Sequence, residues 1–142
     1  FGGTSIDEFT FNPVAVNVID YLTIVTAGNA EDFGDLTQAY TGTAACSDNT
    51  YGVISGGNFT VDIQYLTLST FGNAIDFGDL TVARSSHASC SDLTYGLFGG
   101  GYTTFPERTS SIDYVTIATP GNATDFGDLD APKIYNASCS GI

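Results

Sequence analysis

The chain has 142 residues and a formal net charge of −13, from 16 acidic residues against three Lys or Arg. A nucleic-acid-binding protein needs clustered basic residues to neutralise phosphates, and an anionic membrane would repel this chain, so we expect neither as a partner. No run approaches the roughly 20 apolar residues of a membrane-spanning helix, and we expect no membrane insertion.

Hydrophobic residues make up 42% of the chain, which is typical of a globular protein and not of a disordered one. The chain is rich in Gly, Thr and Ser and has no long apolar stripe with a helical period, so the predicted fold class is all-β in a single domain. Because it contains no Met, we expect it to be processed or to belong to a longer protein.

A nine-residue phrase occurs three times, at 28–36, 72–80 and 121–129. Each copy follows a Tyr (Tyr21, Tyr65, Tyr114) and precedes a Cys (Cys46, Cys90, Cys139), and Tyr and Cys are always 25 positions apart. The step between the Tyr residues is 44 and then 49, so the variable length lies between a Gly-Gly pair and the next Tyr. We therefore predict three copies of one unit, centred on 18–57, 62–101 and 112–142, the last completed by 1–3.

Along the chain, residues 1–17 are predicted to finish one strand and then form the longest variable connection. The segments 18–26, 62–70 and 112–119 are rich in β-branched and aromatic residues and predict strands. A Gly-Asn turn follows each, and then Asp-Phe-Gly-Asp-Leu as a short edge-like strand.

The third strand of each unit is built of small residues, at 43–47, 87–91 and 136–140, which suits a place where backbones crowd. An apolar strand ending at a glycine pair follows at 51–57 and 95–101. Each unit therefore has four predicted strands.

These residues resemble the kelch repeat of β-propellers: a Tyr-bearing strand (Tyr65), an aromatic (Phe77), a small-residue inner strand (87–91) and an apolar strand ending in Gly-Gly (95–101). Val82-Ala-Arg84 resembles the Pro-Arg stretch before the inner strand. Phe33, Phe77 and Phe126 stand where kelch repeats usually have Trp. The resemblance implies propeller blades, of which a ring needs four to eight.

Three blades do not close a ring, so further repeats of the same chain or self-association are the expected partners. Alternatives are a β-trefoil or a β-prism closed within the chain, or an open β array. The amino-acid sequence of the repeats also resembles repeats in bacteriophage tail and fibre proteins. That resemblance implies a non-enzymatic structural or adhesion module, in a virion or extracellular, that recognises a cell-surface glycan or protein.

Each unit carries a pair of acids beside an Asn: Asp32/Asp35, Asp76/Asp79 and Asp125/Asp128. Such oxygen ligands suit Ca²⁺, or the acid and base of a propeller-type enzyme. The spacing matches no EF-hand loop, and the favoured interpretation is that Asn and Asp satisfy N–H groups of turns, with no cofactor.

The Cys residues and the repeated Tyr and Phe are interpreted as structural residues, the thiols packing as small apolar groups without a disulfide. Five further aromatic residues lie in the variable connections, where the repeat does not require them, and are the candidate ligand-binding residues: Phe9, Phe11, Phe59, Tyr102 and Phe105.

Overall fold

The computed structural model describes residues 4–6 and 13–139, and all regular secondary structure within them is β-strand, which confirms the predicted all-β class. The strands are β1 (Thr4–Ile6), β2 (Pro13–Tyr21), β3 (Glu31–Tyr40), β4 (Ala44–Ser47), β5 (Tyr51–Ser55), β6 (Thr60–Thr67), β7 (Ile75–Arg84), β8 (Ala88–Ser91), β9 (Tyr95–Gly99), β10 (Tyr102–Thr104), β11 (Glu107–Arg108), β12 (Ser111–Thr116) and β13 (Thr124–Asp128). In these ranges no helix is long and apolar enough to cross a membrane.

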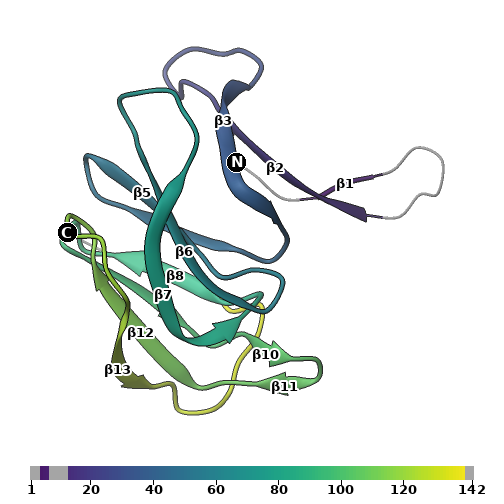
Figure 1. Cartoon of the computed structure of the whole chain (residues 1–142), viewed down its shortest axis with the longest axis vertical. Helices are drawn as coiled ribbons and strands as arrows, with labels where there is room; N and C mark the ends of the chain where they lie inside the picture. Colours follow the sequence, from purple (N-terminus) through teal and green to yellow (C-terminus); the bar gives the residue numbers. More distant parts are fainter. Residues whose placement is uncertain (1–3, 7–12, 140–142) are drawn as a thin grey trace.

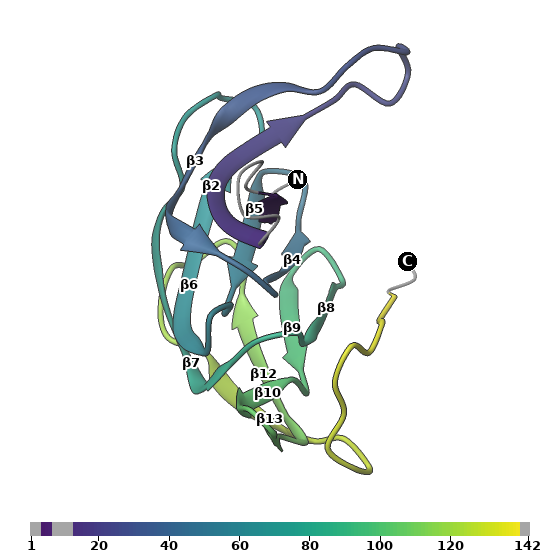
Figure 2. The same ribbon diagram turned by 90° about the vertical axis from the view of Figure 1, so that its right-hand side faces the viewer.

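The strands form three main antiparallel sheets in chain order (Figure 1). The first has the order β1-β2-β3, the second β4-β5-β6-β7 and the third β8-β9-β12-β13, while β10 and β11 form a separate hairpin. The described residues do not close into a barrel or ring. Figure 2 shows β4 and β8 lying near each other at one edge of the stack, where the small residues let neighbouring sheets approach closely.

The three sheets repeat one another in register as well as in order. Tyr51 lies opposite Thr67 in the second sheet, and Tyr95 lies opposite Thr116 in the third. A β-bulge follows the same position in all three sheets, beside a glycine with positive φ: Gly34 (+149°), Gly78 (+143°) and Gly127 (+137°). Such a φ is strained for residues with a side chain, which explains the repeated glycine of the nine-residue phrase.

The first predicted strand of each unit extends too far toward the C-terminus. β2, β6 and β12 end at Tyr21, Thr67 and Thr116, because a turn follows each of them. In these turns the backbone N–H of a Thr donates to the carbonyl of the Thr three residues earlier, in Thr23–Thr26, Thr67–Thr70 and Thr116–Thr119. The β-branched residues there occupy turns, so local propensity is overridden.

Two further strand predictions differ from the structure. In the first two units the Asp-Phe-Gly-Asp-Leu segment lies in an edge strand, as predicted, but this strand is not short, because β3 and β7 are each 10 residues long and pair with β2 and β6. The small-residue strands match β4 and β8, but residues 136–139 form no strand, and residue 140 lies outside the described residues.

The main core lies between the second and third sheets. It combines residues of β4 to β7 with residues of β9 and of the β12 region: Cys46, Val53, Ile63, Phe77, Leu80, Phe98, Val115 and Ile117. A smaller cluster joins the first and second sheets through Leu36, Tyr40 and Ala74. Each sheet is therefore stabilised mainly by burying apolar area against its neighbour in the stack.

Candidate functional site

The variable connections branch from equivalent points of the units. In the second unit the N–H of Thr60 donates to the carbonyl of Gly57 (2.9 Å), and in the third the N–H of Thr109 donates to Gly101 (3.0 Å). In the second unit the segment closed by this hydrogen bond is a tight turn, whereas in the third unit it is the β10–β11 hairpin. In the first unit, β1 and the start of β2 pair in the same part of the sheet. We call the hairpin, the tight turn 57–60 and the β1–β2 pairing the rim.

Three aromatic rings gather on the rim at the β10–β11 hairpin. Tyr102 lies 5.6 Å from Phe105 and 6.0 Å from Tyr135, between ring centroids. Phe105 and Tyr135 are each 77% exposed, so their rings face solvent. Exposed aromatic rings of this kind supply rigid contact area at little cost in side-chain entropy.

The other candidate aromatics are not part of this cluster. Phe59 lies in the tight turn of the second unit, at a φ of +61°, and no described ring contacts it. Phe9 and Phe11 lie outside the described residues. Tyr135 was not among the predicted binding residues, because it follows the third phrase in sequence and reaches the hairpin only through the fold.

The turns behind the rim connect one sheet to the next and are tied together along the stack. The N–H of Ser86 donates to the carbonyl of Gly42 (2.7 Å), and the N–H of Tyr135 donates to that of Ser86 (3.1 Å). Tyr102 also exchanges two backbone hydrogen bonds with Ser85. The aromatic cluster is therefore held by backbone contacts from the hairpin, the 85–86 turn and the C-terminal segment.

A buried ion pair lies beneath the rim, between the second and third sheets. Arg84 Nη2 is 3.1 Å from Asp113 Oδ2. The guanidinium also donates to the carbonyl of Ser111 (2.9 Å), and Asp113 accepts hydrogen bonds from the N–H (2.9 Å) and hydroxyl (2.6 Å) of Thr81. Burial lowers the pKa of Arg84, and the Asp113 charge opposes that effect.

Between the first and second sheets, the positions of this ion pair hold two uncharged side chains. Tyr40 and Gln64 occupy the positions of Arg84 and Asp113, 19 residues after one repeated Tyr and one residue before the next. Gln64 Oε1 accepts the N–H of Thr37 (2.8 Å), as Asp113 accepts that of Thr81, and Tyr40 donates its hydroxyl to Asp62 (2.6 Å). The fold therefore accepts either an ion pair or uncharged side chains at these equivalent positions, which argues against a catalytic role of the ion pair.

His87 is buried near this network. Its Nε2 lies 2.9 Å from Ser55 Oγ, and Nδ1 has no hydrogen-bond partner in the part of the chain that the structure describes. Burial, with a smaller effect of the Arg84 charge, lowers the pKa of His87 to about 3. A histidine that stays neutral and shielded from solvent is a poor general base for an external substrate.

The repeated phrase joins successive units. The N–H of Asp35 donates to Asn73 Oδ1 (3.0 Å), and the N–H of Ala74 donates to the carbonyl of Asp35 (2.8 Å). Asp79 makes the same two contacts with Asn122 (3.1 Å) and Ala123 (2.8 Å). We call this contact the clasp: a Gly-Asn-Ala turn of one unit on the Phe-Gly-Asp segment of the preceding unit.

The clasp accounts for the Asn residues beside the predicted acid pairs. Asn73 and Asn122 accept N–H groups of the preceding unit, and not of their own turns as predicted. Among residues 4–6 and 13–139, no three His, Cys, Asp or Glu side chains are grouped so that they would hold a metal. The six paired acids instead lie along three equivalent strands, at Asp32, Asp35, Asp76, Asp79, Asp125 and Asp128.

The repeated Tyr and Phe contact each other in every unit, with ring centroids 6.1 Å apart for Tyr21–Phe33, 5.6 Å for Tyr65–Phe77 and 6.0 Å for Tyr114–Phe126. The Cys residues are all free; Cys46 is buried, Cys90 half-buried and Cys139 exposed. Cys46 sits on Gly96 of the next unit, where an added Cβ would lie 2.6 Å from its Sγ. Burial is the main cause that raises the pKa of Cys46 to about 12.

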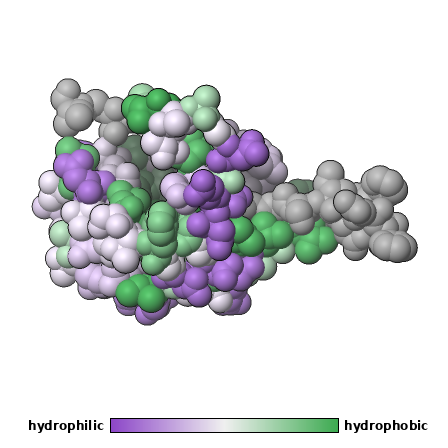
Figure 3. Space-filling view, turned by 90° about the horizontal axis from the view of Figure 1, so that it is seen from above, coloured by the Kyte–Doolittle hydropathy of each residue, from purple (hydrophilic) through white to green (hydrophobic). Residues whose placement is uncertain are grey.

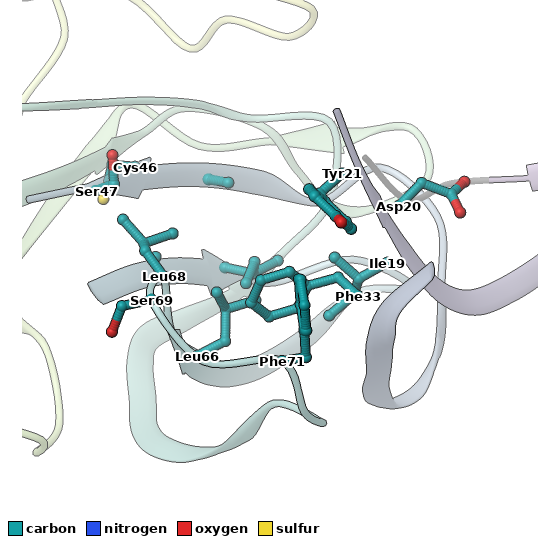
Figure 4. Close-up of a pocket in the computed structure, with 13 residues that line it drawn as sticks. Ile19, Asp20, Tyr21, Phe33, Cys46, Ser47, Leu66, Leu68, Ser69 and Phe71 are labelled. Carbon is teal, nitrogen blue, oxygen red and sulfur yellow. The ribbon is translucent and has the colours of Figure 1, made fainter. Parts of the chain in front are cut away.

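A cavity of about 570 Å³ lies between the first and second sheets. Figure 4 shows Leu66 and Phe71 of the second unit facing Ile19 and Phe33 of the first, with Cys46 at the other side. The lining is mainly apolar, so the cavity is suited to an apolar side chain and not to a charged substrate.

No family model and no curated protein matches this chain.

Proposed function

We propose that the chain is a non-enzymatic structural and adhesion module of a virion tail fibre or another extracellular assembly, built from kelch-like propeller blades. In this proposal the sheets are a constant scaffold, and the rim recognises a cell-surface glycan or protein. Support comes from the contrast between the sheets, which repeat in register, and the connections, which differ in length.

The observation that carries the recognition part is the exposed cluster of Tyr102, Phe105 and Tyr135. A soluble protein gains no burial from exposed aromatic rings, whereas a partner does when it covers them. Aromatic side chains of this type are enriched in protein interfaces. The backbones of Tyr102 and Tyr135 are hydrogen-bonded to the 85–86 turn, so little ordering of these two residues is needed on binding.

The non-enzymatic part rests on the roles of the polar residues. Asp113 forms an ion pair and accepts three hydrogen bonds, and His87 is buried with its ring next to the Ser55 hydroxyl. The paired acids recur in every unit, whereas an active site usually breaks the symmetry of a repeat.

Binding is tested on a glycan array and by pull-down from solubilised cell-surface proteins. The informative chimera replaces 102–109 with Asn58-Phe-Thr60, which has the length of the second unit and preserves the closure at Gly101. We expect bound glycan or protein to be lost in this chimera and in the Phe105→Ala/Tyr135→Ala variant.

Ile75→Ala is the control, because Ile75 is also exposed but lies in β7, outside the rim. It is expected to bind as the unchanged chain does. Binding that survives the chimera, and also survives exchange of the other two connections, would exclude recognition through the rim. Turnover of a bound glycan would contradict the non-enzymatic part.

A further inference from the structure

We propose that the first sheet of one copy docks head to tail on the third sheet of a second copy, repeating the contact that joins successive sheets within the chain. The head surface consists of Leu22, Ile24 and the turn 28–30. The tail surface consists of Leu97, residues 126–128 and the C-terminal segment 136–139. This proposal concerns the two ends of the stack and does not depend on what the rim binds.

The clasp leaves one half unused at each end of the stack. An added Cβ on Gly78 would lie 2.5 Å from the carbonyl of Gly121, so these two glycines allow a close approach between units. Gly127 is the equivalent of Gly78 in the third unit, and an added Cβ on it would meet no atom within 4 Å among the described residues. The turn at 28–30 is the equivalent in the first unit of the turn that begins at Gly121. The turn at 28–30 and the segment at 126–128 are thus complementary halves of a third clasp.

Apolar side chains at the two ends of the stack are exposed, whereas their equivalents between the second and third sheets are buried. Phe126 is 62% exposed, whereas the equivalent Phe77 is 3% exposed. Ile24 is 93% exposed, whereas the equivalent Ile117 is 1% exposed. Within the chain, Phe77 and Ile117 share one core. The same residue types therefore lack their cover at the two ends of the stack.

The shapes of the two end surfaces also correspond. A hollow of about 380 Å³ on the third sheet is lined by Leu97, Tyr114 and Phe126 together with Asp92 and Tyr95. Ile24 projects from the loop after β2. Figure 3, viewed from the end of the molecule that carries this loop, shows hydrophobic residues exposed among hydrophilic ones. We infer that Ile24 enters the hollow as Ile117 enters the core.

The cavity between the first two sheets is a further place that a second copy can fill. Between the second and third sheets the corresponding space is occupied by Cys46, which lies on Gly96. Gly52 is the equivalent glycine and lines the cavity. Cys139 is the equivalent of Cys46 in the C-terminal segment, and it is exposed. In the docked pair, Cys139 of one copy would lie on Gly52 of the other.

The C-terminal segment is already placed for this role. Ser138 Oγ donates to the carbonyl of Ser89 (2.5 Å), just as Ser89 Oγ donates to the carbonyl of Ala45 (2.6 Å). Residues 136–139 thus continue the series begun by β4 and β8. They would take the place of β4 and β8, the inner strands, in the first sheet of the second copy.

A head-to-tail contact between identical chains is heterologous, and it closes into a ring where the rotation allows. Two copies bring six sheets together, which lies within the four to eight blades of closed propellers. We therefore expect a two-copy ring.

The test is sedimentation equilibrium over a wide concentration range, starting from the monomer mass of 14.8 kDa. The unchanged chain should reach twice this mass. Ile24→Asp disables the head surface and Phe126→Asp disables the tail surface; both residues are exposed in the single chain, so the fold should survive. Each variant should self-associate about 10- to 100-fold more weakly, the factor expected for one large apolar side chain.

The mixture of the two variants is the decisive measurement. In the mixed pair one contact joins two unchanged surfaces and the other joins two disabled ones, whereas both contacts are impaired in a pair of identical variants. Because a contact that is already lost cannot be lost twice, the mixture should associate more tightly than either variant alone. Ile75→Asp is the control, since Ile75 is 54% exposed and the first unit has Glu31 at the equivalent position. The proposal is overturned by an unchanged chain that stays monomeric, by variants that associate as tightly as the unchanged chain, or by a mixture that associates no more tightly than either variant alone.

Discussion

Arg84 of β7 and Asp113 of β12 form an ion pair across two sheets, and neither side chain is exposed to solvent. The pair is accompanied by hydrogen bonds from Arg84 to the carbonyls of Phe98 (3.3 Å), Gly100 (3.4 Å) and Ser111 (2.9 Å). These bonds compensate for the loss of water around the guanidinium. Removing one partner therefore leaves a buried charge without its counter-charge.

We predict that Asp113→Ala lowers the free energy of unfolding by about 3–5 kcal/mol, the usual cost of breaking a buried pair from one side. Urea denaturation followed by circular dichroism measures the change. A loss below about 1 kcal/mol, comparable to an exposed pair, would contradict this account.

A matched triple variant gives the contact between the second and third sheets the residues found between the first and second sheets. The substitutions Arg84→Tyr, Ser111→Asp and Asp113→Gln reproduce Tyr40, Asp62 and Gln64. We expect this triple variant to be more stable than Asp113→Ala alone, because no unpaired guanidinium remains buried. If the triple variant and Asp113→Ala were equally unstable, the two contacts between sheets would not be equivalent.

His87 predicts a pH dependence of stability. Its pKa is lowered from 6.5 to about 3 in the folded chain. Above pH 6.5 both states are neutral at this residue and it has no effect. As the pH falls from 6.5 toward 3, the unfolded state binds a proton that the folded state does not, so stability decreases by up to about 1.4 kcal/mol per pH unit.

His87→Gln removes this titration while keeping a polar partner for Ser55. Urea titrations between pH 4 and 7 should give a shallower loss of stability for His87→Gln than for the unchanged chain. Parallel curves over that range would mean that His87 is protonated in the folded state as readily as in the unfolded state.

The clasp predicts different costs for two equivalent glycines. Gly78 and Gly127 have similar positive φ, so alanine strains the backbone alike at both. Only Gly78 abuts Gly121 within the chain. We expect Gly78→Ala to lower the free energy of unfolding by about 1–3 kcal/mol more than Gly127→Ala, from overpacking.

This comparison is made by urea denaturation at a dilution where the chain is monomeric. Equal losses in the two variants would show that the backbone strain accounts for the whole effect. In that case the close approach of Gly78 to Gly121 would carry no energetic weight.

The three Cys residues predict a graded reactivity. With a pKa raised to about 12, Cys46 holds about one thiolate in ten thousand at pH 8, and it is buried as well. Pulse alkylation followed by peptide mass spectrometry should label Cys139 first, then Cys90, and Cys46 only on unfolding. Cys46→Ser is the control for peptide assignment, and early labelling of Cys46 in the folded chain would contradict its cover by the third sheet.

Two residues of the aromatic cluster on the rim could be predicted from the sequence. Tyr102 and Phe105 stand out because the variable connection does not require aromatic residues. Tyr135 does not, because its position in the repeat marks only a linker and its contact with Tyr102 spans 33 positions. The partner of Arg84 was equally hidden, since Asp113 looks like one acid among 16.

The sequence by itself determines the all-β class, the three units and the places where their length varies. These properties depend on residue types and spacings, which express local backbone preferences. Only the tertiary structure decides that the nine-residue phrase is a contact between units, and that Phe77 is buried while Phe126 is exposed. Burial is a property of the neighbouring sheet, so identical residues in identical units have different environments according to their place in the stack.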